Sequence, residues 1–250
     1  MNVSLYQAAA ALDANSRWQD VISDNLASSS VPGFRKQSLT TAAVQAGLMS
    51  ADASGQPQFF SIPRTSVSIS FKNGELDYTG NDKNAAIEGD GFFQVELANG
   101  TPAVTRDGEF RVNSQGQLVS KEGYTVMSDS GAPIHLDPHN RNALSISATG
   151  EVRQGGEVKG KIGLTDFENP QLLTPTNGVY FLAADPGLQT KPATGSLREG
   201  FVEGANTTAL TEMANMMTAN RTFEANEKII QIQDDRIGKV INDLGNPTSS

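Results

Sequence analysis

The chain has 250 residues, a length that buries a hydrophobic core in one large domain or in two smaller ones. A formal net charge of -9, with no run of basic residues, excludes general binding to nucleic acid or to anionic membrane surfaces. Cysteine is absent, which excludes disulfides, thiol catalysis and thiolate metal sites, and no run of 18 apolar residues predicts a transmembrane helix.

Residues 1–31 predict an amphipathic helix that ends before Pro32 and Gly33. Its apolar side chains recur at intervals of three and four residues, and the polar residues Asn15 and Gln19 interrupt the stripe. The stripe comprises Leu5, Ala8, Leu12, Ile22 and Leu26, with Ala11 and Trp18 at its edge. No charged segment followed by an apolar block opens the chain, so a cleaved secretory signal peptide is not expected.

The middle of the chain predicts a β-rich domain over residues 65–185. Residues 32–64 show no periodicity, and we expect a linker or irregular extended segment there. Val67, Ile69 and Phe71 then alternate with polar residues before an Asn73-Gly74 turn, which predicts a hairpin. Glycines follow at intervals of seven to nine residues from position 91 to position 131, which is typical of short antiparallel strands. Residues 186–205 are expected to form a connector.

Residues 206–250 predict a long helix with an apolar column of period seven. Asn206, Thr207 or Thr208 is a candidate N-cap. The column comprises Met216, Phe223, Ile230, Ile237 and Leu244. The second column that we expect is mixed, and it comprises Met213, Asn220, Glu227, Asp234 and Ile241. A seven-residue period is the pattern of a coiled coil, so this helix is expected to have a helical partner.

The two predicted helices are expected to pair with each other across the length of the chain. The N-terminal helix is the other amphipathic helix that the sequence predicts, and it is too short to cover the C-terminal one. The surplus apolar surface is therefore expected to contact other chains. The predicted fold class is α+β, mainly β, with terminal helices paired as a coiled-coil-like domain and an antiparallel β-rich domain inserted between them.

Four phrases of the sequence resemble those of the bacterial flagellar rod and hook proteins. The first is "DVISDNLASSSVPGFRKQ", which carries Asn25, Leu26, Ala27, Gly33 and Phe34. The second is "AAIEGDGFFQV", which carries Gly89, Asp90, Gly91, Phe92 and Phe93, and "TRDGEFRVNSQGQLVSKEGYTV" follows it. The fourth is "FVEGANTTALTEMANMMTANRTFEANEKII", which carries Asn206. The serines at 28–30 and Asp24 depart from the usual wording, so the subfamily stays open.

This resemblance implies a structural, non-enzymatic subunit of the flagellar basal-body rod, without a cofactor. It implies helical polymerisation through the terminal helices, which forms the periplasm-crossing drive shaft around an export channel, and we favour the proximal rod over the distal rod. The implied partners are copies of this chain, other rod and hook axial proteins, and the flagellar type III export apparatus. Export would proceed without a cleaved signal peptide, and the lack of cysteine fits passage as an unfolded chain.

Two other classes of function stay open at this point. A secreted β-rich binding module, oligomerised by its terminal helices, has the same pattern of elements. A metal-dependent enzyme would use His135, Asp137 and His139, which alternate along the chain, although Pro138 interrupts that strand and we expect no metal. Separately, Arg35, Lys36 and Arg221 either are solvated or form ion pairs between subunits with Glu224, Glu227 or Asp234.

Overall fold

The computed structural model describes residues 3–49, 58–137 and 144–245, and the chain is α+β, mainly β, with a helix at each end. It divides into two compact units. The helical unit comprises Met1–Ala27, Gln37–Ser68 and Ala209–Ser250, and the β unit comprises Ser28–Lys36 and Ile69–Thr208. Within the described part of the chain, none of the helices is apolar enough over sufficient length to span a membrane.

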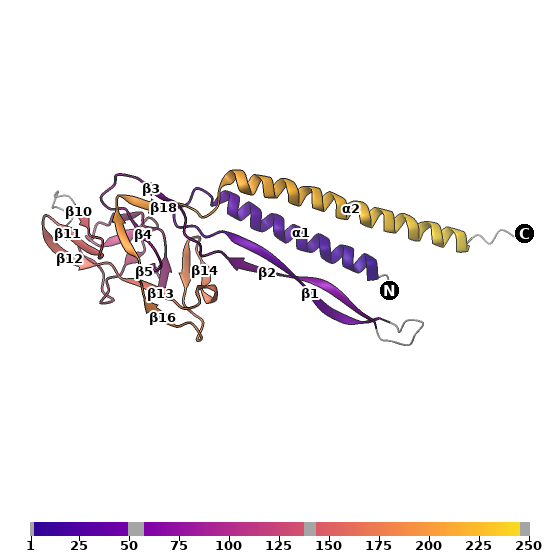
Figure 1. Cartoon of the computed structure of the whole chain (residues 1–250), viewed down its shortest axis with the longest axis horizontal. Coiled ribbons are helices and arrows are strands. Elements are labelled where there is room, and N and C mark those ends of the chain that lie inside the picture. The colour runs from indigo at the N-terminus through magenta and orange to yellow at the C-terminus, as the bar shows by residue number, and fades with distance from the viewer. Residues whose placement is uncertain (1–2, 50–57, 138–143, 246–250) are drawn as a thin grey trace, which may run out of the picture. The chain divides into compact units, whose positions relative to one another are not determined.

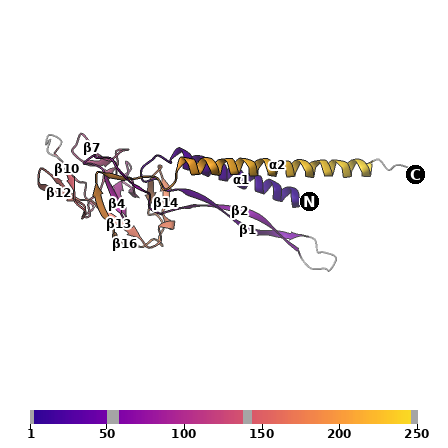
Figure 2. The same cartoon turned by 45° about the horizontal axis from the view of Figure 1, so that its top comes forward.

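The helical unit joins the two ends of the chain. It contains α1 (Val3–Ala27), α2 (Ala209–Gly245) and the strands β1 (Gln37–Met49) and β2 (Gln58–Ile69), which pair with each other. The two helices lie side by side and run in opposite directions, and α1 also contacts β1 (Figure 1; Figure 2). The β1–β2 pair occupies most of the segment that the sequence predicted to be irregular.

The β unit is built from short antiparallel strands. The largest sheet follows the order β14-β15-β6-β5-β9-β8-β7, and β13 joins it beside β5 and carries β16 at its other edge. A smaller sheet has the order β10-β11-β12, and two further pairs are β17–β4 and β18–β3. The first nine strands of this unit are β3 (Leu76–Tyr78), β4 (Ala85–Glu88), β5 (Phe92–Glu96), β6 (Pro102–Thr105), β7 (Phe110–Val112), β8 (Leu118–Ser120), β9 (Thr125–Val126), β10 (Leu144–Ile146) and β11 (Glu151–Gln154). The remaining elements are β12 (Glu157–Lys161), β13 (Leu164–Phe167), the 3-10 helix η1 (Pro170–Leu172), β14 (Thr174–Thr176), β15 (Tyr180–Leu182), β16 (Thr190–Pro192), β17 (Ser196–Glu199) and β18 (Phe201–Glu203).

Two sequence predictions in this unit differ from the structure. The expected connector at 186–205 contains β16, β17 and β18, which pair back onto earlier strands, and Leu197 of β17 is buried. The expected hairpin at Asn73-Gly74 is also absent from the described residues. Gly74 N donates a hydrogen bond to Glu203 Oε1 at 2.7 Å, and β3 pairs with β18 rather than with the preceding strand.

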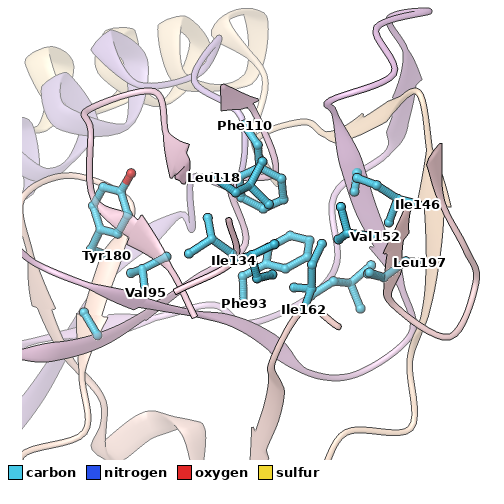
Figure 3. Close-up of a cluster of buried hydrophobic side chains, with 14 of the residues drawn as sticks. Phe93, Val95, Phe110, Leu118, Ile134, Ile146, Val152, Ile162, Tyr180 and Leu197 are labelled. Atoms are coloured by element: carbon cyan, nitrogen blue, oxygen red, sulfur yellow. The ribbon is translucent and has the colours of Figure 1, made fainter. Parts of the chain in front are cut away.

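The β unit has two hydrophobic clusters, and the adjacent residues Phe92 and Phe93 enter one each because neighbouring strand residues point to opposite faces. The larger cluster gathers side chains from β5, β7, β8, β10, β11, β15 and β17 around Phe93 (Figure 3). The smaller cluster is aromatic and comprises Phe92, Val104, Phe167, Leu173 and Phe181.

Candidate assembly surface and motif residues

The contact between α1 and α2 has a polar centre. Asn15 Nδ2 donates a hydrogen bond to the Ala219 carbonyl oxygen at 3.1 Å, and Gln19 Nε2 donates to Asn220 Oδ1 at 3.1 Å. Asn15 is 5% exposed and Ala219 is fully buried. The small side chain of Ala219 leaves room for this approach to the backbone of α2.

The α1 stripe predicted from the sequence lies on the covered side of the helix. Ile22 is buried, and Leu12, Trp18 and Leu26 are half-buried. Val21 and Asn25 are buried as well, so α1 is covered over a wider arc than the predicted stripe. The side chain of Leu5 lies outside the described residues.

The main column of α2 is covered only in part. Met216, Phe223, Ile230 and Ile237 are all half-buried, and the side chain of Leu244 lies outside the described residues. Because these side chains keep part of their surface in water, the helical unit retains apolar surface along the α1–α2 contact.

The predicted second column of α2 is not covered by α1 in the single chain, although Asn220 accepts a hydrogen bond from Gln19. Met213, Asn220, Glu227 and Asp234 are exposed. The covered residues beside the main column are instead Glu212, Ala219, Asn226 and Gln233. Ala219, Asn226 and Gln233 each lie three positions after a main-column residue, and Glu212 lies seven positions before Ala219. The predicted second column lies three positions before the main-column residues. Ala219, on this side of the column, accepts the hydrogen bond from Asn15 of α1.

Asn25, the first motif residue, closes the end of α1 onto the start of β1. Its side chain is buried and forms two hydrogen bonds with the backbone of one residue. Asn25 Nδ2 donates to the Gln37 carbonyl oxygen, and Gln37 N donates to Asn25 Oδ1, both at 2.8 Å. The neighbouring motif residues Leu26 and Ala27 are half-buried and exposed, respectively.

Gly33 and Phe34 fix the segment that follows α1 inside the β unit. Gly33 has φ of +72°, and its N donates to the Glu203 carbonyl oxygen at 2.7 Å. A Cβ at this position would lie 2.3 Å from Asp107 N, so both the backbone conformation and the available space require glycine. Phe34 is buried in the larger hydrophobic cluster.

A buried triad of charged side chains joins three distant parts of the β unit. Glu203 is fully buried, and its two carboxylate oxygens pair with Arg35 Nη2 at 2.7 Å and Arg106 Nη1 at 3.1 Å. Arg106 Nη2 also donates to the Gly89 carbonyl oxygen at 2.9 Å. Burial lowers the pKa of Arg106 from its ordinary value, and the attraction of Glu203 opposes that change. The triad therefore holds two cations around one anion.

This triad corrects the prediction for Arg35. The sequence placed Arg35 either in solvent or in an ion pair between subunits, whereas its side chain is 1% exposed and its carboxylate partner lies within the same chain. The sequence does not identify Glu203 as the partner of Arg35 or of Arg106, because 168 residues separate Arg35 from Glu203 and 97 residues separate Arg106 from Glu203.

Asn206 holds three backbone segments together. Lys36 N donates to its Oδ1 at 2.6 Å, and its Nδ2 donates to the carbonyl oxygens of Ser70 and Lys72 at 2.7 and 2.8 Å. The sequence proposed a helix cap for Asn206, but α2 begins at Ala209 and both polar atoms of the Asn206 side chain are bound elsewhere. The Asn206 side chain therefore holds the backbone at Lys36, Ser70 and Lys72 together, and we call this set of three hydrogen bonds the Asn206 clamp.

The central motif, Gly89 to Phe93, forms a tight bend into β5. Gly89 and Gly91 have φ of +109° and +135°, and the Asp90 carbonyl oxygen accepts a hydrogen bond from Gly195 N at 3.0 Å. A Cβ on Gly91 would lie 2.8 Å from the Ala193 Cβ. The glycines therefore allow residues 193–195 to pack closely against the bend, and the two phenylalanines fill the two clusters.

Asp107 and two of the three candidate metal ligands, His135 and Asp137, lie within the described residues. Asp107 is buried, which raises its pKa to about 7, and its Oδ1 accepts a hydrogen bond from Glu109 N at 2.9 Å. His135 and Asp137 are exposed on either side of buried Leu136, and His139 lies outside the described residues. No cluster of metal-ligating side chains occurs in the ranges that the structure describes.

Comparison with known proteins links this arrangement to one family. The family model described as the flagellar hook protein FlgE/F/G D1 domain matches residues 86–154, and the model described as the flagellar basal body rod FlgEFG protein C-terminal matches residues 198–244. The flagellar basal-body rod protein FlgF of Mesorhizobium japonicum is 34% identical over 225 residues, which cover 90% of each chain. FlgG of Buchnera aphidicola subsp. Schizaphis graminum is 29% identical over 95% of this chain and 98% of its own, and FlgF of Rhizobium meliloti is 27% identical over 98% and 99%.

Proposed function

Because this chain belongs to the flagellar basal-body rod protein family, we propose that it polymerises helically through its terminal helices into the periplasm-crossing drive shaft around the export channel. Its partners are copies of itself and other rod and hook axial proteins. We assign it to the proximal rather than the distal rod.

The observation that carries this proposal is the pairing of the two chain ends. Helices separated by almost two hundred residues lie side by side, yet the apolar column of α2 is only half-buried. Isolated subunits would keep this surface in water, and polymerisation would cover it, which favours assembly over the free subunit. The side chains proposed for helix packing and subunit contact are Leu5, Leu12, Trp18, Ile22, Leu26, Met216, Phe223, Ile230, Ile237 and Leu244.

The helices pair as a coiled coil in this proposal. The covered residues of α2 alternate at intervals of four and three from Glu212 to Ile237, which is the spacing of a coiled-coil seam. Polar residues such as Asn226 and Gln233 in that seam weaken the contact between α1 and α2 of one chain. Contacts with neighbouring subunits would then add the missing stability during assembly. In this proposal the chain reaches its site through the flagellar export apparatus, and the lack of cysteine supports passage as an unfolded chain.

Deletion of the gene followed by electron microscopy of isolated basal bodies tests this function. If the chain is a proximal subunit, basal bodies of the deletion strain should lack the rod beyond the inner membrane ring. If it is a distal subunit, a short part of the rod should remain. Restoration of the rod by the wild-type gene is the control. Rods of normal length in the deletion strain would contradict the proposal and would favour a secreted β-rich binding module.

A further inference from the structure

We propose that a groove between α1, α2 and β1 receives the outer face of α2 from a second copy of this chain. This inference rests on the proposed function, because it names the surfaces through which one subunit contacts the next. Such a contact requires a groove that receives side chains, an exposed stripe that enters it, and an arrangement in which the stripe of one chain cannot reach the groove of the same chain.

The receiving surface is an open groove of about 400 Å³ within the helical unit. Alanine and threonine side chains leave the space, and Trp18 and Leu39 supply apolar walls. The lining residues are Ala11, Ala14, Asn15, Trp18, Leu39, Thr41, Thr222 and Asn226. One water molecule occupies about 30 Å³ of liquid water, so the groove is many times larger than one water molecule and has room for side chains of a partner.

The groove also contains an unpaired hydrogen-bond acceptor. Asn15 is 5% exposed, and its Nδ2 donates a hydrogen bond to the Ala219 carbonyl oxygen. Its Oδ1 is buried and accepts no hydrogen bond. An unpaired buried acceptor costs free energy, so a partner that donates a hydrogen bond here would be favoured over a purely apolar one.

The inserted surface is an apolar stripe on the outer face of α2. Leu210, Met213 and Met217 follow one another at intervals of three and four residues and are 79%, 52% and 58% exposed. Arg221 continues the stripe one turn later, is exposed, and has no ion pair within the part of the chain that the structure describes. Its guanidinium carries only donors, which matches the acceptor at Asn15.

The stripe and the groove lie on opposite sides of the same helix. Met217 and Asn226 are separated by nine residues, or about 180° around the helix axis at roughly 100° per residue. One chain therefore cannot fill its own groove with its own stripe. Contact between copies joins two different surfaces, and such an interface extends into an open helical array unless the rotation closes.

In the proposed contact, Met217 of the second copy enters the groove beside Trp18, where its thioether packs against the indole ring. Arg221 of the second copy then donates a hydrogen bond to Asn15 Oδ1. Because Oδ1 is buried in the free chain, this bond forms as the Asn15 side chain turns toward the groove. The length of an arginine side chain allows the apolar stripe to remain against Trp18 and Leu39 while the guanidinium reaches the acceptor.

Disulfide cross-linking in cells tests this contact, because the wild-type chain contains no cysteine. The variants Thr222→Cys and Met217→Cys place one thiol in the groove and one on the stripe. After oxidation and isolation of basal bodies, we expect the double variant to form a ladder of covalent oligomers. Coexpressed single variants should form dimers, and each single variant alone should remain monomeric. Thr41→Cys, on β1, replaces Thr222→Cys if the latter fails to assemble.

The control and the contrary results separate this inference from the proposed function. Thr222→Cys combined with Val158→Cys, an exposed position in the β unit, should give no ladder. Adding Arg221→Gln to the Met217→Cys/Thr222→Cys pair should lower the yield of oligomers severalfold. Dimers from Met217→Cys alone, or no cross-link although the chain is present in basal bodies, would overturn the inference and leave the function standing. Absence of the wild-type chain from basal bodies would overturn both.

Discussion

Replacement of Glu203 by glutamine should destabilise the β unit strongly. The substitution preserves size and leaves an oxygen for the hydrogen bond from Gly74 N, but it removes the negative charge between Arg35 and Arg106. Those two guanidiniums are 1% and 3% exposed, so water cannot replace the lost carboxylate.

The expected loss follows from the burial of the triad. Removing one member of a buried ion pair typically costs about 3–5 kcal/mol, because the remaining charge is left uncompensated. Folded proteins of this size have an unfolding free energy of about 5–15 kcal/mol, so the change takes a large share of it. The matched control is Glu88→Gln. Glu88 lies 3.8 Å from Arg198, both side chains are about half exposed, and the expected loss is below about 1 kcal/mol.

Urea unfolding of the purified chain measures this difference. Near-UV circular dichroism reports Tyr78, Tyr124 and Tyr180 of the β unit together with Tyr6 and Trp18 of the helical unit. The fluorescence of Trp18, which is the single tryptophan, follows the helical unit alone, so the part of the circular dichroism change that the fluorescence does not share is the tyrosine transition of the β unit. We expect Glu203→Gln to shift the tyrosine transition to much lower urea than Glu88→Gln does. Transitions of the two variants within about 1 kcal/mol of each other would refute the reasoning that the triad is an obligate buried network.

Three further substitutions test single features of the fold. Burial raises the pKa of Asp107 to about 7, so its own contribution to the unfolding free energy should be largest below pH 4 and should be lost as the pH rises to 7; urea titrations should therefore show Asp107→Asn gaining stability relative to the wild type between pH 4 and pH 7, and a difference between the two chains that does not change with pH would contradict the assignment. Gly33→Ala should cost several kcal/mol more than Gly100→Ala, because both glycines have similar positive φ and only Gly33 faces a backbone clash; equal melting temperatures would contradict this. Asn206→Ala should cost roughly 2–4 kcal/mol through its three lost side-chain hydrogen bonds, and hydrogen exchange should rise at Lys36; unchanged exchange there would contradict the clamp.

The parts of the fold that the sequence predicted correctly depend on local periodicity. The column from Met216 to Ile237 predicted α2, and the three-four stripe predicted α1, because the helix repeat places such residues on one side. Regular glycine spacing predicted the β-rich middle. Gly100, Gly116, Gly123 and Gly131 all have positive φ, so they occupy turns that other residues adopt with difficulty.

The features that the sequence did not predict depend on distant partners. Arg35 and Asn206 were each interpreted from their neighbours in sequence, whereas their bonds reach Glu203, Ser70 and Lys72. The β1–β2 pair was also missed, because alternation of apolar and polar residues occurs only at the end of β2, at Val67 and Ile69, and residues 37–64 do not show it. The second column of α2 depends on which side approaches α1, and the periodicity of one helix does not contain that information.

The central claim, assembly through the α2 column, is tested most directly by measuring how much of the Ile230→Asp variant enters isolated basal bodies. Ile230 is half-buried on the column, and an aspartate there would place a charge in a contact that excludes water. The matched control is Ile229→Asp, which introduces the same charge one residue away at a position that is 50% exposed. The Trp18 fluorescence of this control monomer should equal that of the wild type, because the helical unit stays folded. We predict that Ile230→Asp is absent from basal bodies and abolishes motility, although limited proteolysis still yields a stable β unit. Normal incorporation of Ile230→Asp into rods of motile cells would contradict the claim.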